Sequence, residues 1–382
     1  MKIVLLGRYN TSEILTGPEK VAKRLHHHLY KLTNEVTFID YFFKHYDRRS
    51  NFILRLFGKE KHSKHNLSRF FGKQIVRENP LVIRLGIVRM ILFLINKKPD
   101  IIHLVTEERF MSLVLLLKIF FKGKIITSLH GILRYEIEES EQRISGRYKD
   151  LILERLFFHN SDVLIGLSDQ QLKIAKRYYP SKEIKKAVKL SLGVDKVFFQ
   201  PIQRKPFDSI KIVFYNGFND FIDRGLNELI PILDESFLDL EDEVSLYIIG
   251  LFPKEIFFTQ KLNIVKVDLM DSTKLSQFFK DKHFLIKGNK VDTFSQFVFE
   301  GMASGLVPLI SSKVGVAELI NNGEEGFIYN DYNELKNILR QKEFINRFLK
   351  MSKSAQDKAQ QYKWVNVIEL YINLYKNEIE KN

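Results

Sequence analysis

The sequence contains no cysteine, which excludes disulfides and every metal site that depends on thiolate ligands. It also lacks an uninterrupted apolar run of about 18 residues, the length that a membrane-spanning helix needs. Its most apolar stretches, 81–96 and 110–121, are interrupted by Arg84, Arg89 and Lys118. The apolar run in the opening MKIVLLGRYN is too short for a signal peptide. No Walker loop, zinc spacing or complete dinucleotide glycine fingerprint is present. We therefore expect a cytoplasmic protein.

Positive charge, by contrast, is abundant and unevenly spread over the 382 residues. Residues 1–200 hold 37 Lys and Arg against 20 Asp and Glu, whereas the remainder holds 23 against 26. A basic first half indicates an anionic partner, and an anionic membrane surface, a lipid-phosphate acceptor and nucleic acid all fit. Solubility alone is the alternative explanation. No motif that reads nucleic acid accompanies the charge, so we expect no nucleic-acid partner.

Short β-branched runs alternate with helical stretches in two successive series, which predicts an α/β fold with parallel sheets. The expected strands of the first series are 2–7, 35–40, 100–105, 124–130, 162–168 and 186–193, and those of the second are 211–217, 244–250, 263–268, 283–288 and 306–312. The stretch 81–97 is expected to be a helix. We therefore predict two Rossmann-like domains facing a central cleft, with the ligand at the carboxyl ends of the strands.

The segment 41–80 differs from the rest of the first half. It mixes Phe, Ile and Leu with dense Lys and Arg and shows no strand alternation. Such a pattern is typical of an interfacial contact with an anionic membrane. A long surface loop with a short helix explains the same pattern equally well, so both interpretations stay open.

The segment 292–329 carries the strongest local signal. Asp292 precedes Glu300 by eight positions, and the polar turn between them opens a helix. This turn, which consists of Thr293, Phe294 and Ser295, would expose backbone N–H groups that favour a phosphate. A carboxylate two turns further on can accept hydrogen bonds from a ribose diol. From spacing alone, an ordinary crossover helix explains the segment at least as well.

The letters D-TFSQFVF-E-GMASG-LVPLI within this segment resemble the signature of retaining glycosyltransferases of family 4, which have the GT-B fold. The resemblance implies that Glu300 binds the nucleotide ribose and that Asp292 contacts the donor sugar. Asp292 stands where the family has Glu, which shortens the reach of the carboxylate by one methylene group. TGPEKVAKRL, which contains Gly17, is similar to the family's glycine loop, and SLHG makes His130 the candidate histidine near the reacting sugar.

YNGFNDFIDRGL, at 215–226, resembles the family segment in which two cations clamp the donor pyrophosphate. Gly217 matches the glycine of its first half, and Arg224 matches the second cation. Arg can supply a bidentate contact to phosphate. Phe218 stands where the first cation is expected, so one half of the clamp is missing. Lys287 or Lys290 is a candidate substitute.

The resemblance also implies how the chain is divided. We predict an acceptor-side domain over 1–200, a linker over 201–209 and a nucleotide-sugar-binding domain over 210–360. QPIQRKPFDS, with its two prolines, predicts the linker. YKWVNVIELYINLY is similar to the family's terminal helix, so 361–382 is expected to pack back on the first domain.

By resemblance, the protein is expected to move a sugar from a UDP- or GDP-linked donor to a hydroxyl group of a carbohydrate or lipid-linked glycan. Retention of configuration and a role in surface polysaccharide biosynthesis are implied with it. Cationic side chains and helix N-termini hold the diphosphate in such enzymes, so we expect no metal and no further cofactor. A lipid-linked acceptor would bring the protein to the cytoplasmic face of the inner membrane. Two alternatives stay open: a GT-B-fold epimerase, and a sugar-nucleotide-binding protein with weakened or lost turnover.

Overall fold

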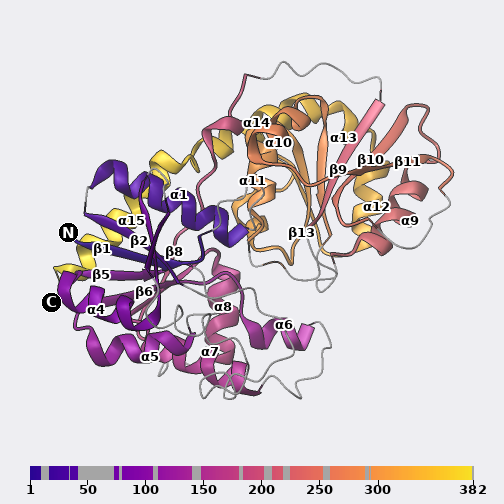
Figure 1. The fold of residues 1–382 in the computed structure, drawn as a ribbon. Coiled ribbons are helices and arrows are strands. Elements are labelled where there is room, and N and C mark those ends of the chain that lie inside the picture. The colour runs from indigo at the N-terminus through magenta and orange to yellow at the C-terminus, as the bar shows by residue number, and fades with distance from the viewer. Residues whose placement is uncertain are drawn as a thin grey trace, which may run out of the picture.

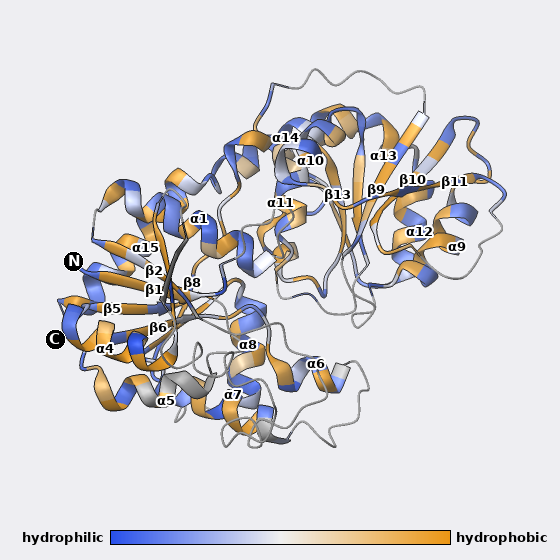
Figure 2. Cartoon of the chain, in the orientation of Figure 1, coloured by the Kyte–Doolittle hydropathy of each residue, from blue (hydrophilic) through white to orange (hydrophobic). Residues whose placement is uncertain are grey.

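The computed structural model describes residues 1–9, 17–33, 35–41, 73–76, 80–105, 111–139, 148–179, 184–201, 209–217, 224–252, 259–288, 292 and 294–380. Two sheets form the centres of the two halves of the molecule, and helices surround each of them (Figure 1). Apolar residues line the strands, and polar residues gather on the outer sides of the helices (Figure 2). The predicted α/β fold with two parallel sheets is confirmed.

The first sheet has the strand order β3-β4-β2-β1-β5-β6-β7-β8. Neighbouring strands run parallel except β3 and β4, which are antiparallel. β1, β5 and β7 are buried along their whole length, because helices cover a parallel sheet on both faces. The strands are β1 (Ile3–Gly7), β2 (Val36–Tyr41), β3 (Lys73–Val76), β4 (Val82–Leu85), β5 (Ile101–Leu104), β6 (Lys124–Ser128), β7 (Val163–Gly166) and β8 (Ala187–Lys189).

The stretch 81–97 is not the single helix that its pattern predicts. Val82–Leu85 forms strand β4, and helix α4 covers only Ile87–Lys97. Gly86 lies between them with an extended backbone. A short apolar run fits a buried strand and a buried helix equally well, since neither shows a polar face. β4 therefore could not be distinguished from the beginning of α4 by periodicity.

Helices on the two faces of the first sheet complete this half. α1 begins at Gly17, and Ser168 caps the N-terminus of α8 by accepting a hydrogen bond from the Gln171 N–H group. These helices are α1 (Gly17–Leu32), α4, α5 (Met111–Phe120), α6 (Leu133–Glu139), α7 (Tyr148–Asn160), α8 (Asp169–Tyr178) and the short η1 (Lys196–Phe198). No helix among the described residues is long and apolar enough to cross a membrane.

The second sheet has the order β11-β10-β9-β12-β13-β14, with all neighbouring pairs parallel. Its strands are β9 (Ser209–Gly217), β10 (Glu243–Gly250), β11 (Leu262–Val267), β12 (Phe284–Lys287), β13 (Val307–Ser311) and the unpredicted β14 (Phe327–Tyr329). The helices around it are α9 (Leu226–Ser236), α10 (Ser272–Phe278), η2 (Phe279–Asp281), α11 (Gln296–Ala303), η3 (Gly315–Leu319), α12 (Tyr332–Arg340), α13 (Lys342–Asn346) and α14 (Phe348–Gln360).

The end of the chain joins the two halves. After α14, helix α15 (Trp364–Ile379) lies against α1 of the first half. The Val194 N–H group donates to the Tyr362 carbonyl at 2.7 Å, and the indole of Trp364 covers Gly193 so closely that a Cβ atom there would collide with it. One hydrophobic cluster therefore runs from the first sheet through Trp364 into the second half. Residues 202–208 of the predicted linker lie outside the described residues, and the predicted domain limits stay a prediction.

Candidate active site

Arg224 and Gly217 meet where β9 ends. Gly217 has a φ of +75°, a left-handed conformation that favours glycine. The Arg224 Nε donates a hydrogen bond to the Asn216 carbonyl at 2.8 Å. Its guanidinium lies so close over Gly217 that a Cβ atom there would be 2.6 Å from Nη2. Gly217 thus leaves the space that Arg224 occupies at the carboxyl edge of the sheet.

Lys287 is a second cation at the same edge. It is the last residue of β12, which neighbours β9, and only 2% of it is exposed. Its Nζ lies 3.0 Å from the Asp292 Oδ2. Burial lowers the pKa of the Lys287 ammonium, Asp292 raises it and the nearby Arg224 lowers it further. The side chains of Arg224, Lys287 and Asp292 therefore share one neighbourhood.

The turn between Asp292 and α11 has an unusual backbone. The Phe294 N–H group donates to the Asp292 Oδ1 at 3.1 Å, and Ser295 has a φ of +70°. Such a conformation is costly for a residue other than glycine and persists only where its surroundings enforce it. The Ser295 side chain does not cap α11. The Phe294 side chain is buried beside Phe299, so it can contribute to a donor site only through its backbone.

Glu300 lies in the middle of α11, and its side chain is 4% exposed. Its carboxylate pairs with the Lys20 ammonium, which comes from α1 of the first half. Burial raises the pKa of the Glu300 carboxyl, Lys20 lowers it, and Asp195 raises it again. The carboxylate that the family resemblance predicts to bind ribose is thus paired with a lysine in this structure.

Tyr215 lies near both Arg224 and Glu300. Its ring stacks on Phe297 of α11, with centroids 5.0 Å apart, and the Arg224 guanidinium lies 5.9 Å above it. Burial raises the pKa of the Tyr215 hydroxyl to about 12, while Arg224 lowers it and Glu300 raises it. The hydroxyl is therefore protonated and the side chain is neutral at physiological pH.

The two first-half candidates, Gly17 and His130, occupy different places. Gly17 begins α1, one turn before Lys20, and an added Cβ atom would meet nothing within 4 Å. His130 follows β6, and its Nε2 donates to the Val105 carbonyl at 2.7 Å. Burial lowers the pKa of the His130 imidazole to about 4, although the bond to Val105 raises it, so the ring is neutral at pH 7.

The structure thus brings Gly217, Arg224, Asp292, Ser295 and Glu300 to one edge of the second sheet, and it joins the Gly17 end of α1 to them through Lys20. The contacts that it gives for His130 are with first-half residues. Three residues named from the sequence, Thr293, Phe218 and Lys290, lie outside the described residues.

Two lysines have a larger place in the candidate site than the sequence predicts, because Lys287 pairs with Asp292 and Lys20 pairs with Glu300. Lys287 was named only as a possible replacement for a missing cation, although a lysine that closes the apolar run FLI is itself a signal of a special environment. Lys20 lies within TGPEKVAKRL, and the motif by itself predicts no role for it. Within the described ranges, no group of three or more His, Cys, Asp or Glu is placed to hold a metal ion.

Comparison with known proteins gives independent evidence on the fold and the activity of this chain. Residues 15–196 match the family model of Glycosyltransferase Family 4. Among curated proteins, the sequence comparison finds no match. Sucrose-phosphate synthase from Thermosynechococcus elongatus superposes on the chain with a TM-score of 0.73, at 13% identity and with 100% of both chains covered.

Two further structures are similar over nearly the whole chain. Anabaena Alr3699/HepE in complex with UDP-glucose has a TM-score of 0.67 at 12% identity, covering 99% of this chain and 100% of its own. The lipopolysaccharide outer core galactosyltransferase WaaB in its apo form has a TM-score of 0.62 at 14% identity, covering 98% of each chain. The whole chain has the GT-B fold. This fold and the match of residues 15–196 to the family model together support a glycosyltransferase.

Proposed function

We propose that the protein transfers a sugar from a nucleotide diphosphate sugar to a hydroxyl group of a carbohydrate or lipid-linked glycan, with retention of configuration. The observation that carries this proposal is the excess of positive charge where β9 and β12 end. Arg224 and Lys287 lie near each other there, and the carboxylate paired with Lys287 is that of Asp292. Two cations beside one carboxylate suit a ligand that is itself an anion, such as a diphosphate.

Each residue then has a distinct role in the transfer. The bond between the anomeric carbon and the diphosphate oxygen breaks, and a bond to the acceptor oxygen forms as the acceptor hydroxyl loses its proton. Arg224 and Lys287 would stabilise the charge that develops on the diphosphate, together with the backbone N–H groups at the start of α11. Asp292 would orient the sugar, Glu300 would bind the ribose, and the neutral His130 would contact the sugar or acceptor from the first domain.

Several finer points belong to the same proposal. Retention of configuration rests on the resemblance of the 292–310 segment to its family signature. UDP-sugars are the first donors to test, because the structure of Anabaena Alr3699/HepE is a complex with UDP-glucose. Surface polysaccharide assembly at the cytoplasmic face of the inner membrane is the pathway that we propose. Because side-chain cations and helix amides would hold the diphosphate, we propose that no metal is needed.

The proposal is tested with a panel of UDP- and GDP-sugars, measured as release of UDP or GDP with and without a chelator. We expect at least one donor to be turned over slowly by hydrolysis, and equally fast when EDTA is present. Asp292→Asn should abolish this release without altering the thermal melting temperature by more than a few degrees. Nucleotide binding without turnover of any donor would contradict the proposal and favour a binding protein. Appearance of an epimerised donor without nucleotide release would favour an epimerase.

Contact with an anionic membrane is a separate part of the proposal. Most of the segment 41–80, where the sequence indicates such a contact, lies outside the described residues. The described part of the first domain supports it through α4 and α5, which lie side by side (Figure 1). Neither 80–99 nor 111–124 contains an Asp or Glu. Leu92 on α4 is 54% exposed and Ile119 on α5 is 73% exposed, and Phe120 is exposed beside it.

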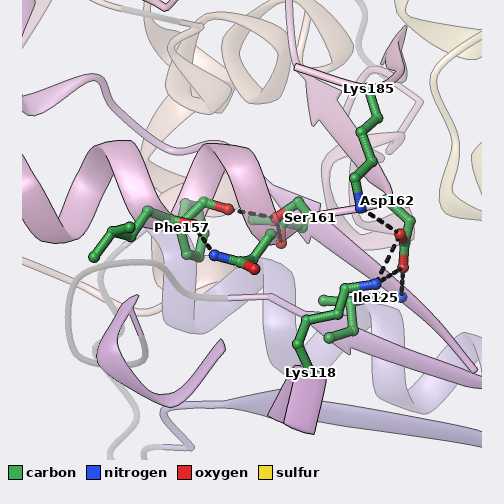
Figure 3. A network of polar contacts seen from close by, with 9 residues as sticks. Lys118, Ile125, Phe157, Ser161, Asp162 and Lys185 are labelled. Carbon is green, nitrogen blue, oxygen red and sulfur yellow. Dashed lines mark hydrogen bonds and ion pairs between the residues drawn. The ribbon is translucent and has the colours of Figure 1, made fainter. Parts of the chain in front are cut away.

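One basic side chain beside these apolar residues has an acidic partner from a distant part of the chain. Lys118 pairs with Asp162, which also binds Lys185 and the Ile125 N–H group (Figure 3). Lys97, Lys98 and Lys122 are exposed and lie at the ends of α4 and α5. Exposed apolar side chains flanked by unbalanced lysines fit an anionic lipid surface.

We expect the protein to sediment with vesicles of phosphatidylcholine and phosphatidylglycerol and not with phosphatidylcholine alone. Replacing Lys97, Lys98 and Lys122 by Gln should weaken binding roughly fivefold for each lysine, since each is worth about 1 kcal/mol near an anionic surface. Leu92→Ser with Ile119→Ser should weaken it as well. Val365→Ser serves as a control, because Val365 is exposed on α15. Equal sedimentation of the lysine variants and the wild type would contradict this contact.

A further inference from the structure

Lys20 and Glu300 form an ion pair between residues 280 positions apart in the sequence. Lys20 belongs to the first turns of α1, whose N-terminal end lies toward α11 (Figure 1). Glu300 belongs to α11 in the other domain. The pair therefore links the domain that we propose to face the acceptor with the carboxylate that we propose to bind the ribose.

The surroundings hold Lys20 in this position. Its Nζ lies 5.3 Å from the centroid of the Phe198 ring as well as beside Glu300, and its side chain is only 14% exposed. One turn further along α1, the Arg24 Nη2 lies 2.7 Å from the Asp195 Oδ2. A surface lysine loses little by moving, whereas this one would leave both a ring contact and a buried carboxylate. Lys20 is thus part of a defined interdomain contact.

A buried carboxylate needs a partner to stay ionised, because removal from water disfavours the charged form. Arg24 and Asp195 also face Glu300, but their charges oppose each other and they pair together. Lys20 is therefore the cation that balances Glu300 directly. The Glu300 carboxylate can still accept further hydrogen bonds, because its two oxygens offer about four acceptor sites and Lys20 uses one of them.

Building on the proposed function, we propose that Lys20 is a positioning residue of the donor site. From the first domain, it holds the Glu300 carboxylate ionised and oriented to accept the ribose hydroxyls. Nucleotide affinity consequently depends on contact between α1 and α11, although Lys20 itself need not touch the nucleotide. The ribose-binding half of the site is complete only when the two domains meet.

The test is calorimetric titration of Lys20→Met, Lys20→Arg and wild type with UDP and with GDP. We expect Lys20→Met to weaken binding of the preferred nucleotide about tenfold or more at pH 7.5, and Lys20→Arg to restore most of it. Lys31→Met is the matched control, because Lys31 is exposed in the last turn of α1 and should leave the affinity unchanged. Should Lys20→Met fail to fold, Lys20→Gln takes its place.

The pH profile separates this role from a merely structural one. Burial raises the pKa of the Glu300 carboxyl and Lys20 opposes that rise, so removal of Lys20 raises the pKa further. As pH falls, Lys20→Met should lose affinity at a higher pH than the wild type. The ligand's own titration is common to both and cancels in their ratio. The remaining groups that face Glu300, namely Arg24, Asp195 and Tyr215, are unchanged in both proteins.

Glu318→Ala is the control for the loss of an interdomain contact that does not involve Glu300. The Glu318 carboxylate accepts hydrogen bonds from the Asp169 and Gln170 N–H groups at the start of α8, also across the domain boundary. This variant should leave the pH profile of binding unchanged. An equal shift in Glu318→Ala and Lys20→Met would overturn the inference, because the effect would then not pass through Glu300.

A double-mutant cycle distinguishes failure of this inference from failure of the proposed function. In a Glu300→Gln background, Lys20→Met should add less than about twofold, because the carboxylate that it serves is absent. If Glu300→Gln weakens nucleotide binding but Lys20→Met does not, the role of Lys20 is wrong and the proposed donor site stands. If Glu300→Gln itself has no effect, the proposed ribose site fails, and the inference fails with it.

Discussion

Replacing Arg224 with alanine is expected to lower kcat for donor turnover by about 10²- to 10³-fold, the usual effect of removing one group that stabilises charge in a transition state. The guanidinium lies over Gly217 at the carboxyl edge of β9, beside the buried Lys287. We place the departing diphosphate there. Its negative charge grows as the sugar leaves, so the loss should fall on kcat more than on KM.

Two variants make this prediction specific to position and shape. Arg224→Lys keeps the charge but loses the planar fork, and it should recover only part of the rate. Gly217→Ala keeps Arg224 but places a methyl group where the guanidinium lies, and it should impair turnover as well. Arg340→Ala is the control, because Arg340 is an exposed arginine of α12 that pairs with Glu235. Turnover near that of the wild type in Arg224→Ala would assign the diphosphate to another cation, and Lys287→Met would then be the next variant.

Glu300→Gln is expected to weaken binding of UDP or GDP about tenfold to a hundredfold, while the fold is retained. Hydrogen bonds to a charged group contribute roughly 1.5–3 kcal/mol, and the amide replaces the carboxylate with a neutral acceptor. Equilibrium titration measures the affinity, and circular dichroism verifies folding. Glu369→Gln, at an exposed glutamate of α15, should leave binding unchanged. Wild-type affinity in Glu300→Gln would remove this residue from the donor site.

The same variant predicts a pH dependence. Burial raises the pKa of the Glu300 carboxyl above its usual range, and Lys20 counteracts part of that rise. The ionised form accepts the ribose hydroxyls, so wild-type affinity should fall as pH is lowered through this raised pKa. Glu300→Gln cannot be protonated in this range and should lack that component. A parallel pH dependence in both proteins would show that another group is responsible.

Much of the fold could be predicted because parallel strands covered on both faces are apolar along their whole length. β1 and β12 are examples, and both were expected within one or two residues of their observed ends. The prediction was wrong at 81–97, where strand β4 and helix α4 are equally apolar. It also missed two short strands: β3, which lies within 41–80 where no strand was expected, and β14, whose three residues are too few to show a period.

Part of the candidate site could be predicted as well, because some of its residues lie close in sequence. Asp292 precedes the turn before α11 and Glu300 lies within that helix, so their spacing is visible in the sequence. The left-handed backbone of Ser295 was not, since nothing in a serine demands it. The packing of Arg224 over Gly217 is a contact in space, which the spacing of the two residues does not reveal.

By itself, the amino-acid sequence determined the alternation of strands and helices, the two successive α/β halves and the acidic pair that begins and occupies the α11 segment. These are local properties, set by hydrophobic period, turn residues and spacing. Only the tertiary structure decided that Lys287 is buried beside Asp292 and Arg224, and that Lys20 pairs with Glu300 from 280 residues away. Ion pairs depend on distance in space and on exclusion of water, and folding alone brings distant residues of opposite charge together.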